Sequence, residues 1–394
     1  MPSADELRIG VIGAGGRGNL ARLAHHPDDG VRVVAGADVR PEALATFREW
    51  FGPDAFVTDD YHAVLARDDI GAVFVTTPDY LHEEHAVAAL EAGKHVYLEK
   101  PMAVTIDGCD RILETARAAG VKLYLGHNMR HFPVMRKMKE RIDAGAIGEP
   151  KVGWCRHFVG YGGDAYFKDW HAERDKSTGL LLQKGAHDID ILHWLCGGYT
   201  RRVTAMGGLT LYDRIADRHA PDEPGDVSWR PENWPPLSQK GLNPVIDVED
   251  VSMMLMHLDS GVFASYQQCH YTPDGWRNYT IIGTEGRIEN FGCVPGPRTC
   301  VRLWNRRTAF DPEGDEVFTF PPLEGSHGGA DPPIVAEFIR YVREGGRIAT
   351  SPVAARYSVA AGCRATASLR AGGQPMDVPP LAARLCAHFD ADLA

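Results

Sequence analysis

Near the N-terminus, an apolar stretch is followed directly by a glycine motif and then by a stretch rich in Ala and Leu. The segment reads LRIGVIGAGGRGNLARLAHH, in which Gly13, Gly15 and Gly18 form G-x-G-x-x-G. This order predicts a buried strand, a tight turn and a helix whose first turn has unpaired backbone N–H groups. Such a turn is typical of sites that hold the pyrophosphate of a dinucleotide in a parallel α/β sheet.

A carboxylate follows the glycine motif at the spacing that ribose recognition requires. The segment VRVVAGADV predicts a second strand that ends at Asp38, twenty residues after Gly18. A carboxylate there can accept hydrogen bonds from both ribose hydroxyls of the adenosine half, which favours NAD. Arg40 keeps NADP as the less favoured alternative, because its guanidinium could pair with a 2′-phosphate.

Helical and strand patterns then alternate up to residue 126. Helices are predicted at 41–51, 81–93 and 105–119, and strands at 72–78, 95–100 and 121–126. This alternation predicts a doubly wound parallel sheet, which binds ligands beyond the carboxyl ends of its strands. Thr77-Pro78 and Glu99-Lys100-Pro101 fall at two of these ends, so we expect both stretches at one edge of the sheet.

Length and charge exclude several classes of protein. A chain of 394 residues is too long for one ordinary core, and its net charge of −11 argues against a nucleic-acid partner. The N-terminus lacks the pattern of a secretory signal, and no run approaches the roughly 18 apolar residues of a membrane span. Eight scattered cysteines without C-x-x-C indicate free thiols, so we expect a cytoplasmic protein without a bound metal.

The second part of the chain shows mainly strand patterns. We expect a dinucleotide-binding domain at 1–127 and a second domain at 128–394. Strands are predicted at 151–159 and 201–211, β-hairpins at 251–268 and 278–292, and closing helices at 334–345 and 353–369. Residues 213–247 form an insertion rich in Pro, Trp and Asp, whose tryptophans favour an ordered arm over a disordered linker.

The stretch QKGAHDID (183–190) combines one histidine, one lysine and two aspartates. At helical spacing Gln183, His187 and Asp190 share one face. From position alone a histidine here is more often a hydrogen-bonded structural residue than a proton carrier, and the stretch leaves both possibilities open.

Several of these stretches together resemble the Gfo/Idh/MocA oxidoreductases. They are GAGGRG (13–18), Asp38, TPDYLH (77–82), EKP (99–101) and the G-x-H-x-x-D at 185–190. The resemblance implies a Rossmann domain followed by an α/β domain with a large open, mainly antiparallel sheet, which usually mediates dimers or tetramers. It also implies action on sugars, cyclitols and related polyols with NAD or NADP.

The resemblance implies roles for particular residues. Lys100 matches the EKP lysine that contacts the reacting hydroxyl, and His187 matches the histidine that usually serves as general acid/base. Asp190 matches the last carboxylate of D-x-G-x-H-x-x-D, whereas the first falls on Gln183, an amide that cannot act as a base. The residues at matching cofactor-side positions are Gly13, Gly15, Gly16, Arg17, Gly18, Asp38, Arg40, Thr77, Pro78, His82, Glu99, Lys100 and Asn128.

The segment 156–174 is dense in aromatic and basic groups. Aromatic faces suit a sugar ring and the cations suit an anionic substituent, although a solvated loop is an equally good interpretation. The candidate substrate-binding residues are Lys100, Arg156, Trp170, Arg174, Gln183, Lys184 and His187.

Three functions are compatible with these residues. The favoured one is an NAD-dependent sugar or polyol dehydrogenase, in which Lys100 and His187 manage the hydroxyl proton. The alternative is a glycoside hydrolase that oxidises the sugar transiently at C3, eliminates, hydrates and reduces again, so that NAD is recycled. A sugar-responsive regulator without turnover is disfavoured by the pair Lys100 and His187.

Overall fold

The computed structural model describes residues 6–323 and 327–390, which divide into two compact units. Within the described residues, unit 1 comprises 6–131, 327–356 and 381–390, and unit 2 comprises 132–323 and 357–380. A single boundary at residue 127 would place 327–356 and 381–390 in the second domain. In the structure both segments pack with unit 1, so the C-terminal part of the chain contributes to both units.

Unit 1 is built on a six-stranded sheet in the order β3-β2-β1-β4-β5-β6, in which every pairing is parallel. The strands are β1 (Leu7–Ile12), β2 (Val31–Ala37), β3 (Phe56–Thr58), β4 (Ala72–Val75), β5 (His95–Leu98) and β6 (Leu123–Leu125). The order reverses between β1 and β4, and ligands of doubly wound sheets bind at the strand ends beside such a reversal.

Helices connect these strands. They are η1 (Gly16–Ala24), α1 (Pro41–Phe51), α2 (Tyr61–Leu65), α3 (His82–Glu91) and α4 (Ile106–Ala119). The element after the glycine motif, η1, is a 3-10 helix throughout, whereas the sequence predicts only that a helix starts there.

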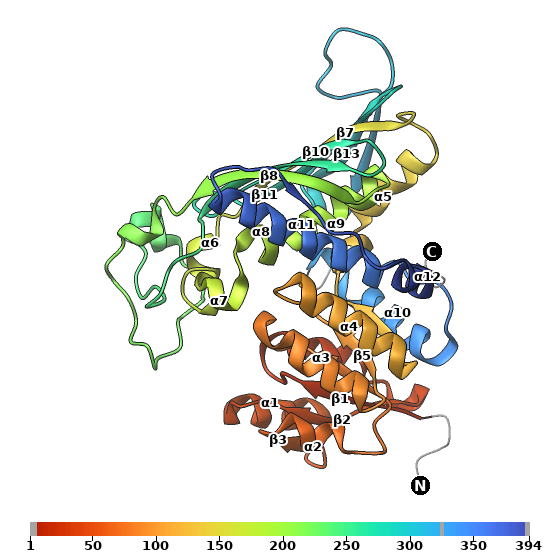
Figure 1. Ribbon diagram of the computed structural model, residues 1–394, viewed down its shortest axis with the longest axis vertical. Helices are drawn as coiled ribbons and strands as arrows, with labels where there is room; N and C mark the ends of the chain where they lie inside the picture. The colour runs from red at the N-terminus through yellow and green to blue at the C-terminus, as the bar shows by residue number, and fades with distance from the viewer. Residues whose placement is uncertain (1–5, 324–326, 391–394) are drawn as a thin grey trace. The chain divides into compact units, whose positions relative to one another are not determined.

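A helix from the C-terminal part of the chain completes the core of unit 1. Helix α10 (Asp331–Glu344) lies beside the first part of the chain, in light blue next to orange elements (Figure 1). Its Ile334 and Phe338 are fully buried in one cluster with Phe74 of β4 and Tyr97 of β5. This burial explains why α10 belongs to unit 1. Helix α12 (Ala383–Asp390) also packs in this unit, against α4.

Unit 2 contains a nine-stranded sheet in the order β14-β13-β12-β11-β7-β10-β9-β8-β15. The strands are β7 (Pro150–Phe158), β8 (Thr200–Gly208), β9 (Val251–Leu258), β10 (Phe263–Cys269), β11 (Trp276–Gly283), β12 (Arg287–Phe291), β13 (Gly296–Trp304), β14 (Glu316–Phe320) and β15 (Met376–Asp377). Only the pair β7–β10 is parallel among the described strands of this sheet. The large, mainly antiparallel sheet expected from the resemblance is therefore confirmed.

One face of this sheet carries α9 (Gly185–Cys196), which contacts β7, β10 and β11. The other helices that contribute to unit 2 are α5 (Pro133–Asp143), α6 (Gly162–Ala165), α7 (Arg174–Ser177), α8 (Leu180–Gln183) and the larger part of α11 (Pro352–Arg370). Helix α8 ends at Gln183 and α9 begins at Gly185, so QKGAHDID spans two consecutive helices.

The insertion at 213–247 follows a defined path along the loop that precedes α7. It contains the short 3-10 turns η7 (Pro231–Asn233) and η8 (Pro236–Ser238), and η6 (Tyr212–Arg214) leads into it. Its Leu242 is fully buried in one apolar cluster with Phe167, and the Asn243 N–H donates to the Phe167 carbonyl at 2.8 Å. The insertion therefore supports the aromatic segment 156–174.

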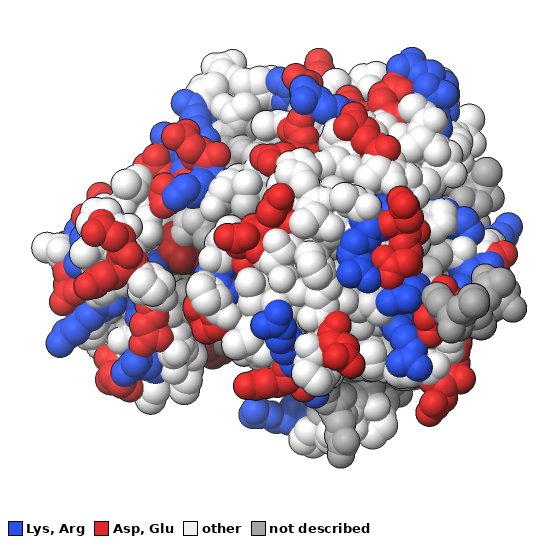
Figure 2. All heavy atoms as spheres, turned by 90° about the horizontal axis from the view of Figure 1, so that it is seen from below, with Lys and Arg blue, Asp and Glu red and all other residues white. Residues whose placement is uncertain are grey.

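Charged side chains of both signs are interspersed on the face of the molecule drawn in Figure 2. In the part of the chain that the structure describes, no helix combines the length and the apolar character that crossing a bilayer requires.

The sheet face opposite α9 exposes a group of large apolar side chains. Met253 and Leu255 of β9 alternate with buried residues and are 53% and 61% exposed. Met206 of β8 lies opposite Met253 in the register, and Phe263 of β10 is also 61% exposed. Contiguous apolar surface of this kind is typical of an interface between subunits.

We therefore predict a homo-oligomer whose subunits meet through this face. Light scattering at micromolar concentration should give a particle larger than the 43.2 kDa of one chain. Leu255→Glu should shift the protein to a single chain, because a charge would have to be buried in the interface. Phe310→Glu, in the loop between β13 and β14, serves as the control and should leave the particle size unchanged. A monomeric wild-type protein would contradict the prediction.

Candidate functional site

The glycine motif forms a tight loop at the carboxyl end of β1. Gly13 has a φ of +89°, and a Cβ built on it would lie 2.8 Å from the backbone of Thr76 and Thr77, which follow β4. A Cβ on Gly18 would lie 2.4 Å from the Gly13 carbonyl oxygen. Only glycine tolerates these approaches, and the loop keeps backbone rather than side chains at its surface. This arrangement fits the diphosphate of a dinucleotide. Gly16 begins η1 with open space where a Cβ would stand.

Asp38 lies next to this loop, at the end of β2. Its Oδ2 accepts a hydrogen bond from the Gly15 N–H at 2.8 Å, and its Oδ1 accepts one from the Arg40 N–H at 3.0 Å. The Arg40 side chain is 56% exposed, and its Nε lies 3.3 Å from Asp38 Oδ1. The structure thus brings together, in unit 1, the glycine loop, the Asp38 carboxylate that is predicted to bind ribose, and Arg40.

We expect Asp38→Ala to weaken NAD binding about 10-fold or more while NADP binding changes little. Removing the carboxylate deletes the acceptor for the ribose hydroxyls, and it frees Arg40 to pair with a 2′-phosphate. Titration of both cofactors, followed by fluorescence, measures the two dissociation constants. Asp59→Ala, an exposed carboxylate after β3, is the matched control. Equal affinity of the wild-type protein for NAD and NADP would contradict the predicted role of Asp38 in the preference for NAD.

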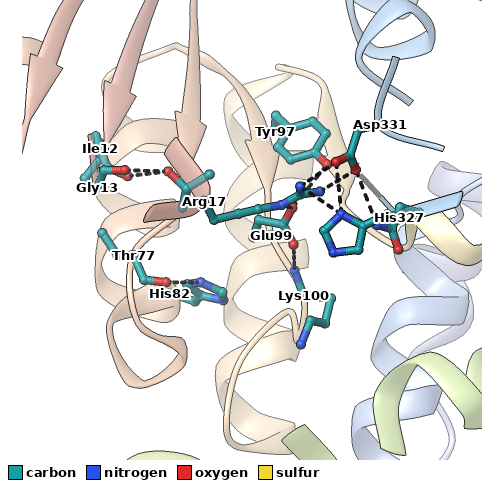
Figure 3. Close-up of polar contacts among 12 residues, drawn as sticks. Ile12, Gly13, Arg17, Thr77, His82, Tyr97, Glu99, Lys100, His327 and Asp331 are labelled. Carbon is teal, nitrogen blue, oxygen red and sulfur yellow. Dashed lines mark hydrogen bonds and ion pairs between the residues drawn. The ribbon is translucent and has the colours of Figure 1, made fainter. Parts of the chain in front are cut away.

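Arg17 of the glycine motif is held between two carboxylates (Figure 3). Its Nε donates to Glu99 Oε1 at 2.7 Å, and its Nη1 and Nη2 donate to the two oxygens of Asp331 at 2.9 Å each. His327 Nδ1 lies 3.0 Å from Asp331 Oδ2. Both carboxylates are largely buried, with 9% and 5% of their side chains exposed. The guanidinium therefore links η1, the end of β5 and the first turn of α10, and we call Arg17, Glu99 and Asp331 the carboxylate clamp.

Lys100 follows the clamp at the carboxyl end of β5. Its backbone N–H donates to Glu99 Oε2 at 3.0 Å, and its side chain is half-buried. Burial alone would raise the pKa of the Glu99 carboxyl, but the Arg17 guanidinium outweighs burial and lowers that pKa. Glu99 is therefore an anion that fixes the backbone of Lys100.

His82 and Asn128 support the strand ends from inside the unit. The fully buried His82 ring lies with Nδ1 2.7 Å from the Pro101 carbonyl oxygen and Nε2 2.9 Å from that of Thr77. It thereby bridges the turns after β4 and β5. Asn128 is 3% exposed and donates from Nδ2 to Asp331 Oδ1 at 3.4 Å. Both side chains hold the protein's own groups in place, and Thr77 and Pro78 remain half-buried at the strand end.

In unit 2, the fully buried Asp188 of α9 is the centre of a polar network. His157 Nδ1 lies 2.9 Å from its Oδ2, Arg277 Nε lies 3.1 Å from its Oδ1, and the Tyr279 hydroxyl donates to Oδ1. Burial opposes ionisation of the carboxyl, but Arg277 and His157 lower the pKa of Asp188 well below its usual range. Burial and Arg277 lower the pKa of His157 to about 3, so its ring is neutral at pH 7.

Sequence reasoning assigned no role to Asp188, although it stands next to His187 in QKGAHDID. His187 is half-buried on α9, and Asp190 is 2% exposed one turn after Ala186. The buried network fixes the turn of α9 that carries His187. The signal that could have identified Asp188 was the second carboxylate of the motif. It directly follows His187, so on a helix it points in a different direction from His187.

Apart from Arg156, the predicted substrate-binding residues of unit 2 separate into two groups. Gln183 and Lys184 lie at the junction of α8 and α9, close to His187 in the chain. Arg174 pairs with Glu249 at 3.2 Å, and Trp170 stacks on His171 with ring centroids 3.7 Å apart.

Arg156 requires a correction. Its neighbours Cys155 and His157 point toward Asp188 of α9, and side chains alternate along a strand, so Arg156 points to the opposite face. There its Nη2 donates to Asn278 Oδ1 at 2.8 Å, with Glu289 3.8 Å away. We therefore do not include Arg156 in the candidate site.

Comparisons with known proteins agree with this geometry. The model described as "Oxidoreductase family, NAD-binding Rossmann fold" matches residues 7–127, and the "GFO/IDH/MocA C-terminal domain" matches residues 135–289. YteT of Bacillus subtilis (strain 168), an oxidoreductase by name, is 28% identical over 83% of this chain and 82% of its own length. An inositol 2-dehydrogenase of Burkholderia cenocepacia (strain HI2424) is 37% identical over 48% of this chain, and the match spans 55% of that relative.

Solved structures show the same fold. A levoglucosan dehydrogenase in complex with NADH and levoglucosan superimposes with a TM-score of 0.77 over 95% of this chain and 100% of that one, at 22% identity. GenD2 from gentamicin A biosynthesis, in complex with NAD, gives a TM-score of 0.73 over 96% and 97%, at 20% identity. With both domain models matched and the glycine loop in place, the chain belongs to the Gfo/Idh/MocA family of NAD-binding oxidoreductases.

Proposed function

We propose that this protein is an NAD-dependent dehydrogenase that oxidises a hydroxyl-bearing carbon of a sugar or polyol. The observation that carries the proposal is the carboxylate clamp, which fixes the backbone of Lys100 at the carboxyl end of β5. A lysine at this edge of a doubly wound sheet stands where such sheets bind their ligands. The names of an inositol 2-dehydrogenase and a levoglucosan dehydrogenase among similar proteins support the substrate class.

The glycine loop at 13–18 and Asp38 would hold the diphosphate and the adenosine ribose of NAD. When bound, NAD supplies the oxidant, which takes a hydride from the substrate carbon. As the hydride leaves, Lys100 would donate a hydrogen bond to the substrate hydroxyl and lower its pKa, and His187 would remove the hydroxyl proton. Buried Asp188 keeps the helix turn of His187 in place, while the Gln183 amide orients a neighbouring hydroxyl.

A panel of cyclitols, sugars and glycosides tests this proposal, with NADH absorbance and release of free sugar followed together. Accumulation of NADH with a sugar or polyol is the expected result. Release of free sugar from a glycoside without net NADH would instead identify a hydrolase that recycles NAD. If neither product forms with any compound while NAD binds, the proposed function is wrong. Mass spectrometry of the cofactor that copurifies with the protein identifies NAD independently.

A further inference from the structure

Lys184 is a buried cation at the junction of α8 and α9. It is 8% exposed, and its Nζ donates to the Tyr161 hydroxyl at 3.0 Å. The ammonium also lies 5.4 Å from the ring centroids of Tyr161 and Tyr166. Among the described residues no carboxylate forms an ion pair with it. Burial of an ammonium that has only neutral partners is costly, so this arrangement calls for an explanation.

Another cation of this region, Arg277, is balanced by a buried carboxylate. Arg277 is opposed by Asp188 at 3.1 Å, and His157 carries no charge at pH 7 because its pKa is lowered to about 3. Lys184 has no such carboxylate partner among the described residues. A low-polarity environment strengthens the attraction of such a charge for an anion.

Unlike Lys184, the neighbouring cations each have a carboxylate partner. Lys168 lies 3.4 Å from Asp164, Arg174 lies 3.2 Å from Glu249, and Lys176 lies 3.0 Å from Glu173. Each of these three is paired with a carboxylate within unit 2. The absence of such a pairing is therefore specific to Lys184 among these cations of the described segment 156–184.

Two more buried polar groups near Lys184 have unused hydrogen-bonding capacity. His270 is fully buried, and neither of its ring nitrogens forms a hydrogen bond within the described residues. Its ring packs 5.2 Å from Tyr166, the same tyrosine whose ring Lys184 approaches. Gln183 is 3% exposed, and its Oε1 likewise accepts no hydrogen bond from the described residues. Buried groups of this kind are normally satisfied by protein, by ordered water or by a ligand that offers both donors and acceptors.

We propose that the substrate is a sugar acid, whose carboxylate pairs with Lys184 while its hydroxyl groups bond to His270 and Gln183. This inference rests on the proposed sugar dehydrogenase function and narrows its substrate class. A carboxylate accepts charge-assisted hydrogen bonds from the ammonium, and hydroxyls can donate to the Gln183 carbonyl oxygen and bond to the neutral imidazole. A neutral sugar would satisfy the amide and the imidazole but would leave the Lys184 charge without a counter-ion.

Equilibrium binding to the full-length, NADH-loaded protein tests the proposal without requiring turnover. The probes are three matched pairs measured by isothermal titration calorimetry: glucose and glucuronate, galactose and galacturonate, mannose and mannuronate. We expect at least one hexuronate to bind about 10- to 100-fold more tightly than its hexose. Lys184→Met should abolish this preference, because methionine keeps the packing on the tyrosines without the charge. Lys184→Arg should preserve most of it.

Lys176→Met is the matched control and should leave the preference unchanged, since its partner is Glu173. Thermal melts establish whether each variant is folded. The comparison of hexuronates with hexoses on the wild-type protein remains valid even if one variant does not fold. Hexuronates that bind no better than their hexoses, or a preference that survives in Lys184→Met, would overturn the proposal. Failure of the dehydrogenase function gives a different result, which is the absence of NADH formation whatever the binding preference.

Discussion

Replacing His187 with Ala is expected to lower kcat by about two to four orders of magnitude while the protein still folds and binds NAD. The loss follows from the proposed role of the imidazole as the group that removes the hydroxyl proton. The melting temperature should change little, because Asp188, and not His187, is the centre of the buried network under α9. Steady-state kinetics and thermal melts, run on the same preparation, measure the two quantities.

Lys100→Ala should damage turnover to a similar extent, and the double variant should be little worse than either single one. Two groups that act on the same proton do not contribute additively, so this comparison tests their joint role. Gln183→Ala serves as the control: its amide can only position the substrate, and we expect mainly a higher KM. A His187→Ala protein that melts early yet turns over normally per folded molecule would show that the histidine is structural.

The fold of unit 1 could be predicted because its signals are local. The glycine motif, Asp38 and the alternating periodicity all lie within short stretches, and a parallel sheet follows from them. The packing of α10 on this sheet could not be predicted in the same way. Its apolar periodicity indicates that Ile334 and Phe338 are buried, but it does not say against which domain, because that depends on contacts more than 200 residues away in sequence.

In the candidate site, too, some residues could be predicted from the sequence and others could not. Lys100 and His187 stand out because charged groups interrupt apolar segments, and resemblance gives them roles. Arg156 was misassigned since density of basic residues carries no information about which face of a strand each one occupies. Asp331 was missed because an aspartate before two prolines reads as an ordinary helix start, and only the folded chain brings it to Arg17.

Asp331→Ala is expected to destabilise unit 1 by about 3 kcal/mol, because it leaves the partly buried Arg17 guanidinium with Glu99 as its remaining carboxylate in the clamp. For a unit of this size, the change corresponds to a melting temperature about 6–12 °C lower. Because the Arg17 pair is bidentate, Asp331→Asn is an informative second variant: the amide keeps the shape and one acceptor but loses the charge. Calorimetry of the intact protein measures both variants.

Asp377→Ala is the matched control, because Asp377 also binds an arginine, Arg202, through both oxygens but on the exposed surface. Exposed pairs contribute little, so that variant should melt close to the wild type.

Turnover separates a positioning role of the clamp from a purely structural one. If the clamp acts on catalysis through Glu99 and the Lys100 backbone, Asp331→Ala lowers kcat at temperatures where the protein is folded. In a Lys100→Ala background the same change should then have little further effect on kcat. An Asp331→Ala protein that melts and turns over like the wild type would show that the clamp neither holds unit 1 together nor positions Lys100.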